Sequence, residues 1–285
     1  MLKLRKFFSV VRRFSNGQTG KGVEESSLGN QVKTKVAVVA KTESIFPSPI
    51  ASSFSYEIRG KEFHAVDIKL TPGQSINARA GCLSYMDQNV SFSTSLTGGI
   101  ATSLNRSVSG STIFLTKYSN TSTQDEALLM LSPPHPSKIV PVDLQQYSGK
   151  LICHRDSFLC GDSRILVTAR YILNPIFGFW GGEGFAFQQL EGEGVGLIAG
   201  GGVIVKKALK EGEEIRLTPG SILAFDSSIQ FKMIAISGIR NIVFGQGMFF
   251  LMLKGPGDVF IQTMPFQKIA KGMFGWLTKY WQKQG

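Results

Sequence analysis

Three segments of this chain share one pattern: Gly81-Cys-Leu-Ser-Tyr-Met-Asp87, Asp156-Ser-Phe-Leu-Cys-Gly-Asp162 and Gly220-Ser-Ile-Leu-Ala-Phe-Asp226. In this aspartate motif, a loop residue and a mostly small or apolar run precede an aspartate. A glycine-aromatic motif follows each copy: Gly110-Ser-Thr-Ile-Phe-Leu115, Gly182-Glu-Gly-Phe-Ala-Phe187 and Gly245-Gln-Gly-Met-Phe-Phe250. Because both motifs recur at nearly the same spacing, the sequence predicts three copies of one small structural unit.

The first and third copies also align without a gap. When Gly73 is aligned with Gly212, apolar positions match apolar positions as far as Phe92 and Phe231. The segment from Phe63 to Leu70 alternates apolar and polar residues, which is typical of a half-buried strand. We therefore predict an all-β repeat domain over residues 54–266. In it, Gly184 and Gly247 are expected at hairpin turns, where glycine tolerates positive φ.

The three aspartates allow two interpretations. Asp87, Asp162 and Asp226 could surround a pseudo-threefold axis and bind a cation. The interpretation that we favour is structural, because an aspartate after a strand commonly accepts backbone N–H bonds in the next turn. The three cysteines include no CxxC pair, and the three histidines are not at zinc-ligand spacings. We therefore expect no metal site, no cofactor and no catalytic residue.

The positive charge of the chain is concentrated at its two ends. Of the formal net charge of +11, residues 1–14 carry +5 and residues 267–285 carry +4, which leaves +2 for everything between them. A nearly neutral body does not favour binding to a nucleic-acid backbone, which requires clustered Lys and Arg. The charge therefore suggests functions for the two ends rather than for the body.

Residues 1–15 are basic, free of acidic side chains and able to form a helix with one apolar side. This composition is typical of a mitochondrial transit peptide, and Arg12-Arg13-Phe14-Ser15 resembles a matrix-processing site. The alternative is an ordinary basic tail. Residues 16–53 are rich in Gly, Ser, Thr, Lys and Pro and are predicted to be a flexible linker. The longest apolar stretch, Met248 to Leu253, has the length of a strand, so we predict no transmembrane helix.

Residues 267–285 are predicted to form a short basic amphipathic helix. Its apolar side would contain Ile269, Met273, Trp276, Leu277, Tyr280 and Trp281, with most of its lysines elsewhere. Tryptophan and tyrosine favour the headgroup region of a bilayer, and lysines attract anionic lipids. The alternative is that this side packs on the β body. The residues predicted to contact a membrane are Trp276, Leu277, Tyr280, Trp281, Lys279 and Lys283.

Four segments resemble one known family: Leu70-Thr-Pro-Gly-Gln-Ser-Ile-Asn-Ala-Arg-Ala-Gly81, Ile139-Val-Pro-Val-Asp-Leu144, Phe179-Trp-Gly-Gly-Glu-Gly-Phe185 and Gly255-Pro-Gly-Asp-Val-Phe-Ile-Gln-Thr-Met-Pro265. Together they resemble the altered inheritance of mitochondria protein 24 family over roughly residues 54–268. The resemblance implies a double-stranded β-helix-like or β-sandwich body with internal repeats, similar to the tryptophan-RNA-binding attenuation protein superfamily. It implies no enzymatic activity. The chain departs from the family's usual pattern at Gly110-Ser-Thr and at Asp156, and we assign no chemistry to either departure.

The resemblance also implies a function. Fungal members of the family are mitochondrial inner-membrane proteins that support crista organisation, so the expected partners are inner-membrane organising proteins and an anionic lipid surface. Our leading hypothesis is a non-enzymatic scaffold that is attached peripherally to that membrane. The alternative is a small-ligand or nucleic-acid binding module of the same β fold. The sequence leaves homo-oligomerisation and the side of the membrane open.

Overall fold

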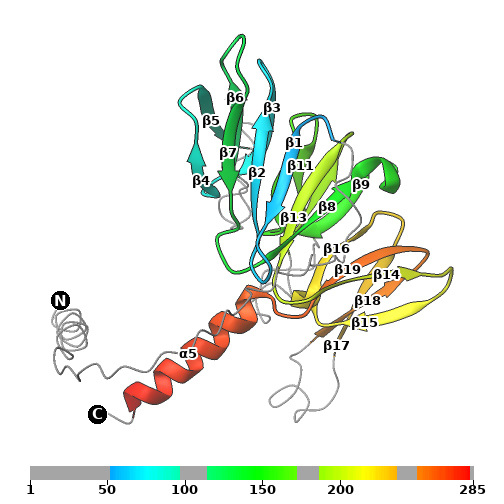
Figure 1. Cartoon of the computed structure of the whole chain (residues 1–285). Coiled ribbons are helices and arrows are strands. Elements are labelled where there is room, and N and C mark those ends of the chain that lie inside the picture. Colours follow the sequence, from blue (N-terminus) through cyan, green and yellow to red (C-terminus); the bar gives the residue numbers. More distant parts are fainter. Residues whose placement is uncertain (1–51, 97–113, 172–185, 236–248, 283–285) are drawn as a thin grey trace, which may run out of the picture. The chain divides into compact units, whose positions relative to one another are not determined.

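The computed structural model describes residues 52–96, 114–171, 186–235 and 249–282 (Figure 1). These residues belong to one compact unit, Glu43–Gly285. In these ranges the chain forms nineteen strands, two short 3-10 helices and one α-helix, and the paired strands are antiparallel. The prediction of an all-β body with one C-terminal helix is confirmed. The predicted transit peptide, the linker as far as residue 51, Gly184, Gly247 and Lys283 lie outside the described residues.

The strands fall into three consecutive modules. Module 1 contains β1 (Ser55–Arg59), β2 (Ala65–Leu70), β3 (Ser75–Arg79), β4 (Leu83–Met86), β5 (Val90–Leu96), β6 (Phe114–Asn120) and β7 (Ala127–Leu131). Module 2 contains β8 (Lys138–Asp143), η1 (Leu144–Tyr147), β9 (Lys150–His154), β10 (Phe158–Asp162), β11 (Leu166–Tyr171), β12 (Ala186–Glu191) and β13 (Val195–Gly200). Module 3 contains β14 (Ile204–Leu209), β15 (Glu214–Leu217), η2 (Pro219–Ser221), β16 (Ile222–Asp226), β17 (Gln230–Ala235), β18 (Phe249–Lys254) and β19 (Gly257–Gln262).

Each module repeats one pairing scheme. Without the additional strand β1, each module has six strands, which form two three-stranded sheets. In module 1 the strand orders are β2-β7-β4 and β5-β6-β3. Module 2 has β8-β13-β10 and β11-β12-β9, and module 3 has β14-β19-β16 and β17-β18-β15. Three copies of one supersecondary unit are therefore present, as the two motifs predict.

Neighbouring modules share sheets. Strand β3 of module 1 pairs with β10 of module 2, and β9 of module 2 pairs with β16 of module 3. Each joint fuses two half-sheets into one six-stranded sheet, so the modules follow one another as a series (Figure 1). The registers of the two joints are equivalent. Cys160 lies opposite Ala78 at the first joint, and Ala224 lies opposite Cys153 at the second.

The same irregularity recurs in each aspartate motif. Register shifts occur between Leu83 and Tyr85, between Phe158 and Cys160, and between Ile222 and Ala224. Each shift therefore lies at the same distance before the aspartate of its motif. A β-bulge redirects the following side chains, so its recurrence shows that the motif encodes a local bend as well as a strand.

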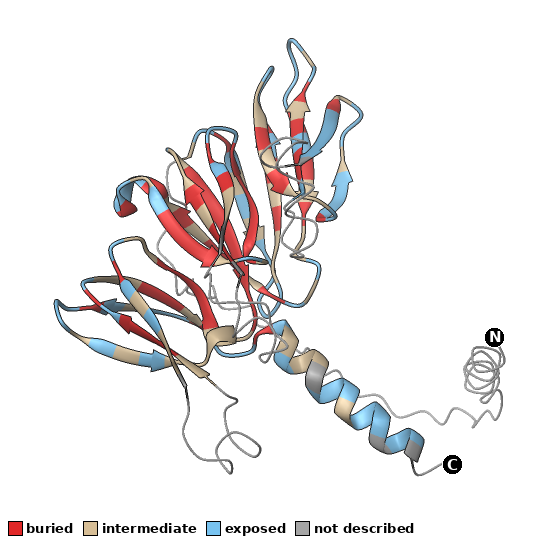
Figure 2. Cartoon of the chain, turned by 180° about the vertical axis from the view of Figure 1, so that it is seen from behind, coloured by how far each residue is buried: buried red, intermediate tan, exposed pale blue. Residues whose placement is uncertain are grey.

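Three apolar clusters fill the spaces between the sheets, and Figure 2 shows the buried residues along the inner strands. The alternation of burial in β2 and β3 produces the first cluster, since every second side chain faces the same side of a strand. In the third, Phe225 is fully buried and packs edge-on against Phe187 and Phe231, with ring centroids 5.5 Å away in both cases. These apolar clusters hold the sheets of the three modules together.

Candidate membrane-binding helix and the cavity at its base

The C-terminal helix α5 (Phe266–Gln282) begins one residue before the predicted start. It follows Pro265, whose carbonyl accepts a 2.9 Å hydrogen bond from the backbone N–H of Lys268. The helix contains three lysines and no acidic residue. Its two glycines, Gly272 and Gly275, lower helix propensity but do not interrupt it.

Most of the large apolar residues of α5 are exposed, whereas Ile269 is intermediate in burial (Figure 2). Trp276 and Trp281 are each 65% exposed, Tyr280 is 46% exposed and Leu277 is 42% exposed. The alternative in which this side packs on the β body is therefore not what the structure shows. Apolar side chains of this size gain free energy when they leave water, so the exposed side is suited to another surface.

Two details refine the predicted helix face. The rings of Trp276 and Tyr280 stack, with centroids 5.6 Å apart and an interplanar angle of 16°. Phe274, which the prediction omitted, is 70% exposed. Helical spacing could have placed Phe274 on the apolar side, because Leu277 and Trp281 follow it at i+3 and i+7 and so share its side of the helix.

The helix is suited to lying on a bilayer. Its 17 residues span roughly 25 Å at about 1.5 Å per residue. Within the described ranges, no helix combines the length and apolarity that a membrane crossing requires. The backbone of Lys279 lies in the last turns of α5, and its side chain, like the whole of Lys283, lies outside what the structure describes. Exposed tryptophans on a basic helix are typical of helices that lie in a membrane interface.

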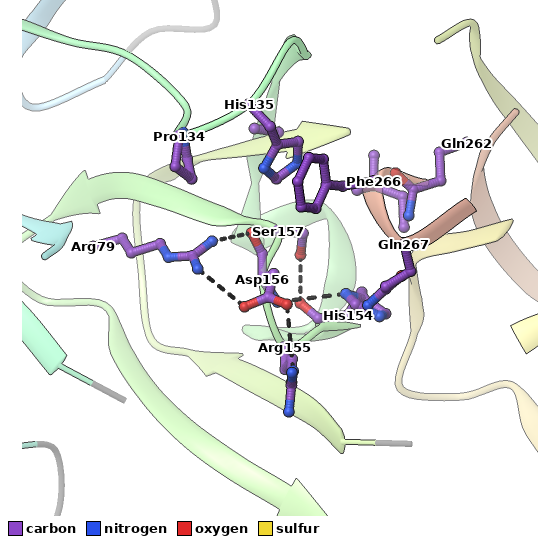
Figure 3. Close-up of a pocket in the computed structure, with 12 residues that line it drawn as sticks. Arg79, Pro134, His135, His154, Arg155, Asp156, Ser157, Gln262, Phe266 and Gln267 are labelled. Atoms are coloured by element: carbon purple, nitrogen blue, oxygen red, sulfur yellow. Dashed lines mark hydrogen bonds and ion pairs between the residues drawn. The ribbon is translucent and has the colours of Figure 1, made fainter. Parts of the chain in front are cut away.

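A cavity of about 410 Å³ lies at the base of α5 (Figure 3). All three modules contribute to it, and so do the first residues of the helix. The ring of His135, from the loop between β7 and β8, stacks on Phe266 with centroids 4.8 Å apart. Burial lowers the pKa of His135 below its ordinary value, and the nearby Arg79 lowers it further. The neutral imidazole is therefore favoured at this contact.

Asp156 organises the cavity wall between modules 1 and 2. Arg79 donates to the Asp156 backbone carbonyl at 2.7 Å and to its carboxylate at 3.0 Å, and Arg155 donates to the same carboxylate at 3.3 Å (Figure 3). The side chains of Arg79 and Asp156 are only about one-third exposed. Sequence reasoning assigned no role to Asp156. Its signal was its position in the repeat, where Gly81 and Gly220 occupy the equivalent sites of the other copies.

The three motif aspartates each lie beside backbone donors. The side chains of Asp162 and Asp226 accept from the N–H groups two residues later, Arg164 at 3.0 Å and Ser228 at 2.9 Å. Asp87 instead accepts from Leu128 on β7 at 2.8 Å. In the part of the chain that the structure describes, no group of three or more His, Cys, Asp or Glu side chains could hold a metal ion.

Asp162 is the most buried of the three aspartates. It is 2% exposed, and burial alone would raise its pKa. Hydrogen bonds from Arg164 and Ser53 outweigh burial and hold the pKa of the Asp162 carboxyl below its ordinary value. A β-carbon on Gly194, which has a φ of +106°, would lie 3.0 Å from Asp162. Gly257 approaches Asp226 in the same way, so the repeated glycine allows the close approach to the repeated aspartate.

The three cysteines are free and buried. Burial raises the pKa of Cys153 to about 12 and raises that of Cys160 as well. Thiols held protonated in this way are poor nucleophiles and metal ligands. Cys153 and Cys160 lie at the two joints between modules, where they act as small apolar side chains.

The fold and the helix define a class of protein: a three-module antiparallel β body with an exposed, basic aromatic helix at its C-terminus. The comparisons with known proteins agree with this architecture. The family model for mitochondrial biogenesis AIM24 matches residues 56–264. The chain therefore belongs to this family, as its sequence resemblance predicts. The matched range covers the β body, and α5 follows it directly.

Two relatives are bacterial. An uncharacterised protein of Streptococcus pyogenes serotype M6 is 25% identical over 221 residues, which cover 74% of this chain and 86% of that protein. The crystal structure of a Streptococcus pyogenes protein is similar to this chain, with a TM-score of 0.64 and 22% identity. The similarity covers 80% of this chain and 99% of that one. At this identity, the similarity shows a shared fold.

Proposed function

We propose that this protein is a non-enzymatic scaffold, attached peripherally to the mitochondrial inner membrane, that supports crista and inner-membrane organisation. The single observation that carries the attachment is the exposed aromatic side of α5, on which both tryptophans are 65% exposed. Burying this side in the headgroup region removes apolar area from water, and the lysines of the helix add attraction to anionic lipid.

The β body supports the scaffold part of the proposal. Its modules are joined through continuous sheets and contain three packed apolar clusters, so it can hold α5 and its partners in fixed positions. The family's association with mitochondrial biogenesis supports a location in mitochondria. The basic, acid-free segment 1–15 supports import. The partners proposed for the body are inner-membrane organising proteins.

Vesicle flotation tests the attachment. The full chain and a variant truncated after Phe266 are mixed with phosphatidylcholine vesicles, with or without cardiolipin. The truncation retains Phe266, whose ring stacks on His135 in the full chain. We expect only the full chain to float, and to do so more strongly with cardiolipin and at low salt. Equal flotation of the two chains would refute attachment through α5.

Import and location need a separate measurement. Protease treatment of mitochondria with intact, ruptured or solubilised membranes determines the compartment in which the chain is protected. We expect the chain to be accessible only after at least the outer membrane is ruptured. Digestion in intact mitochondria would exclude an internal location and with it the proposed partners.

A further inference from the structure

In the part of the chain that the structure describes, the series of modules ends in two unpaired strand edges. Within the described residues, β4 of module 1 and β15 of module 3 each have a paired neighbour on one side only. Their counterparts are paired on both sides: β10 and β16 correspond to β4, and β3 and β9 correspond to β15. Figure 1 shows β4 and β15 at opposite ends of the series, so one chain does not close this joint by itself.

The incompletely covered core of module 3 lies beside the β15 edge. Val205 on β14 is 47% exposed, although the equivalent Val66 and Val140 are at most 1% exposed. Ile215 and Leu217 on β15 are partly exposed, whereas their module 1 equivalents, Ile76 and Ala78, are fully buried. In modules 1 and 2 these positions are covered by the half-sheet of the following module. Among the described strands, none forms a module after module 3.

The outer face of module 1 is likewise more exposed than the equivalent face of module 2. Tyr85 on β4 is 43% exposed, and the residues at its position in the other modules, Cys160 and Ala224, are fully buried. Leu128 on β7 is 39% exposed, and Val195, its equivalent in module 2, is 1% exposed. In module 2 this face packs into the first apolar cluster, beneath the preceding module. No strand of the described residues forms a module before module 1.

We propose that these two surfaces bind each other between copies of this chain, with β15 of one copy pairing antiparallel with β4 of the next. The register follows from the two joints within the chain, where Cys160 lies opposite Ala78 and Ala224 opposite Cys153. The equivalent pair between copies is Tyr85 opposite Leu217, followed by Met86 opposite Arg216. Tyr85 and Leu128 of the second copy then complete the cover over Val205 and Ile215.

This contact is heterologous, since it joins two different surfaces. After each addition the assembly still has one free β4 edge and one free β15 edge, so addition continues until a ring closes or a filament grows. The two surfaces supply complementary parts of a joint that forms twice inside the chain: β4 has the bulge of such a joint, and both surfaces have apolar side chains at positions that the internal joints bury. The inference is independent of α5 and of membrane attachment.

The first test measures the mass of the full chain in solution by light scattering. We expect a multiple of the 31.1 kDa chain mass. Leu128→Lys places a charge on the module 1 surface and Val205→Lys does so on the module 3 surface, so each variant alone should be monomeric. Each variant keeps the surface that the other lacks. A mixture of the two should therefore form a one-to-one dimer that grows no further.

The matched control is Leu166→Lys, because Leu166 is a 53% exposed leucine on an edge strand of module 2, which has both neighbouring modules. This variant should retain the wild-type mass, and thermal melts of all variants show whether they fold. A monomeric wild type would overturn the proposal. So would lysine variants that keep the wild-type mass, or a mixture of folded monomers that forms no dimer.

The second test measures the register. Differently tagged chains carrying Tyr85→Cys or Leu217→Cys are mixed and oxidised. Directly opposite residues on antiparallel strands have Cα atoms within disulfide distance, and the three native cysteines are buried. We expect a covalent dimer containing both tags. Absence of this dimer, or equal yield when Leu166→Cys replaces Tyr85→Cys, would contradict the proposed pairing.

Discussion

Replacing both exposed tryptophans of α5 should abolish most of the membrane affinity. Trp276 and Trp281 are each 65% exposed, and a tryptophan offers up to about 250 Å² of surface. Roughly 160 Å² per ring can therefore be buried. At about 25 cal/mol per Å², removing this area from water contributes at most about 4 kcal/mol of binding free energy. An interfacial helix buries only one side of each ring, so we take about 2 kcal/mol per tryptophan. The double variant Trp276→Ser/Trp281→Ser should then lose about 4 kcal/mol, or roughly 1,000-fold in partitioning.

The assay is quantitative flotation of the full chain over a range of concentrations of cardiolipin-containing vesicles. The matched control is Phe63→Ser, because Phe63 is an aromatic residue of the β body that is 66% exposed. This variant should bind like the wild type. The reasoning is refuted if the double variant keeps more than about one-tenth of the wild-type partition coefficient, or if Phe63→Ser lowers it equally.

Three further predictions concern the body. Asp162→Asn should lower the free energy of unfolding by about 1–3 kcal/mol, because it weakens buried, charge-assisted hydrogen bonds, while the more exposed Asp226→Asn should cost less; chemical denaturation compares them. The pKa of His135 is lowered in the fold, so the unfolded chain gains a proton first as the pH falls below about 6.5. Stability should therefore decrease from there down to the folded-state pKa, and His135→Phe should reduce this decrease in melts at pH 7.5 and 5.5; an unchanged decrease would exclude His135 as its source. Asp156→Gly, which restores the residue of the other copies, should destabilise the joint by about 1 kcal/mol through loss of the partly exposed Arg79 pair, and a stabilised variant would contradict this role.

Much of the fold could be predicted because the repeat is defined by local sequence features such as turn glycines and strand-like alternation. Gly73 and Gly212, which align between the first and third copies, both have positive φ in equivalent turns. The joints between modules could not be predicted in this way. They depend on which strand edges meet. Nothing in a single sequence indicates that Ala78 and Cys160 lie opposite each other. Asp156 was overlooked for the same reason, since its partner Arg79 is 77 residues away.

The C-terminal helix could likewise be predicted only in part from the sequence. The spacing of Trp276, Leu277, Tyr280 and Trp281 predicted one apolar side, since helical periodicity is a local property. It could not show whether the β body covers that side, because coverage depends on where the chain leaves β19. The exposure of those side chains shows that the β body does not cover that side. Phe274 is not part of the predicted apolar side, because it shares helical spacings only with Leu277 and Trp281 at one margin of that side.

The most direct test of the scaffold proposal is fractionation of mitochondria that express either the wild-type chain or the Trp276→Ser/Trp281→Ser variant. After the outer membrane is ruptured and the inner membrane is sonicated, we expect wild-type protein in the membrane pellet, from which alkaline carbonate releases it. The double variant should be in the soluble fraction before carbonate is added. Identical distributions of the two chains, or wild-type protein that carbonate does not release, would contradict peripheral attachment through α5.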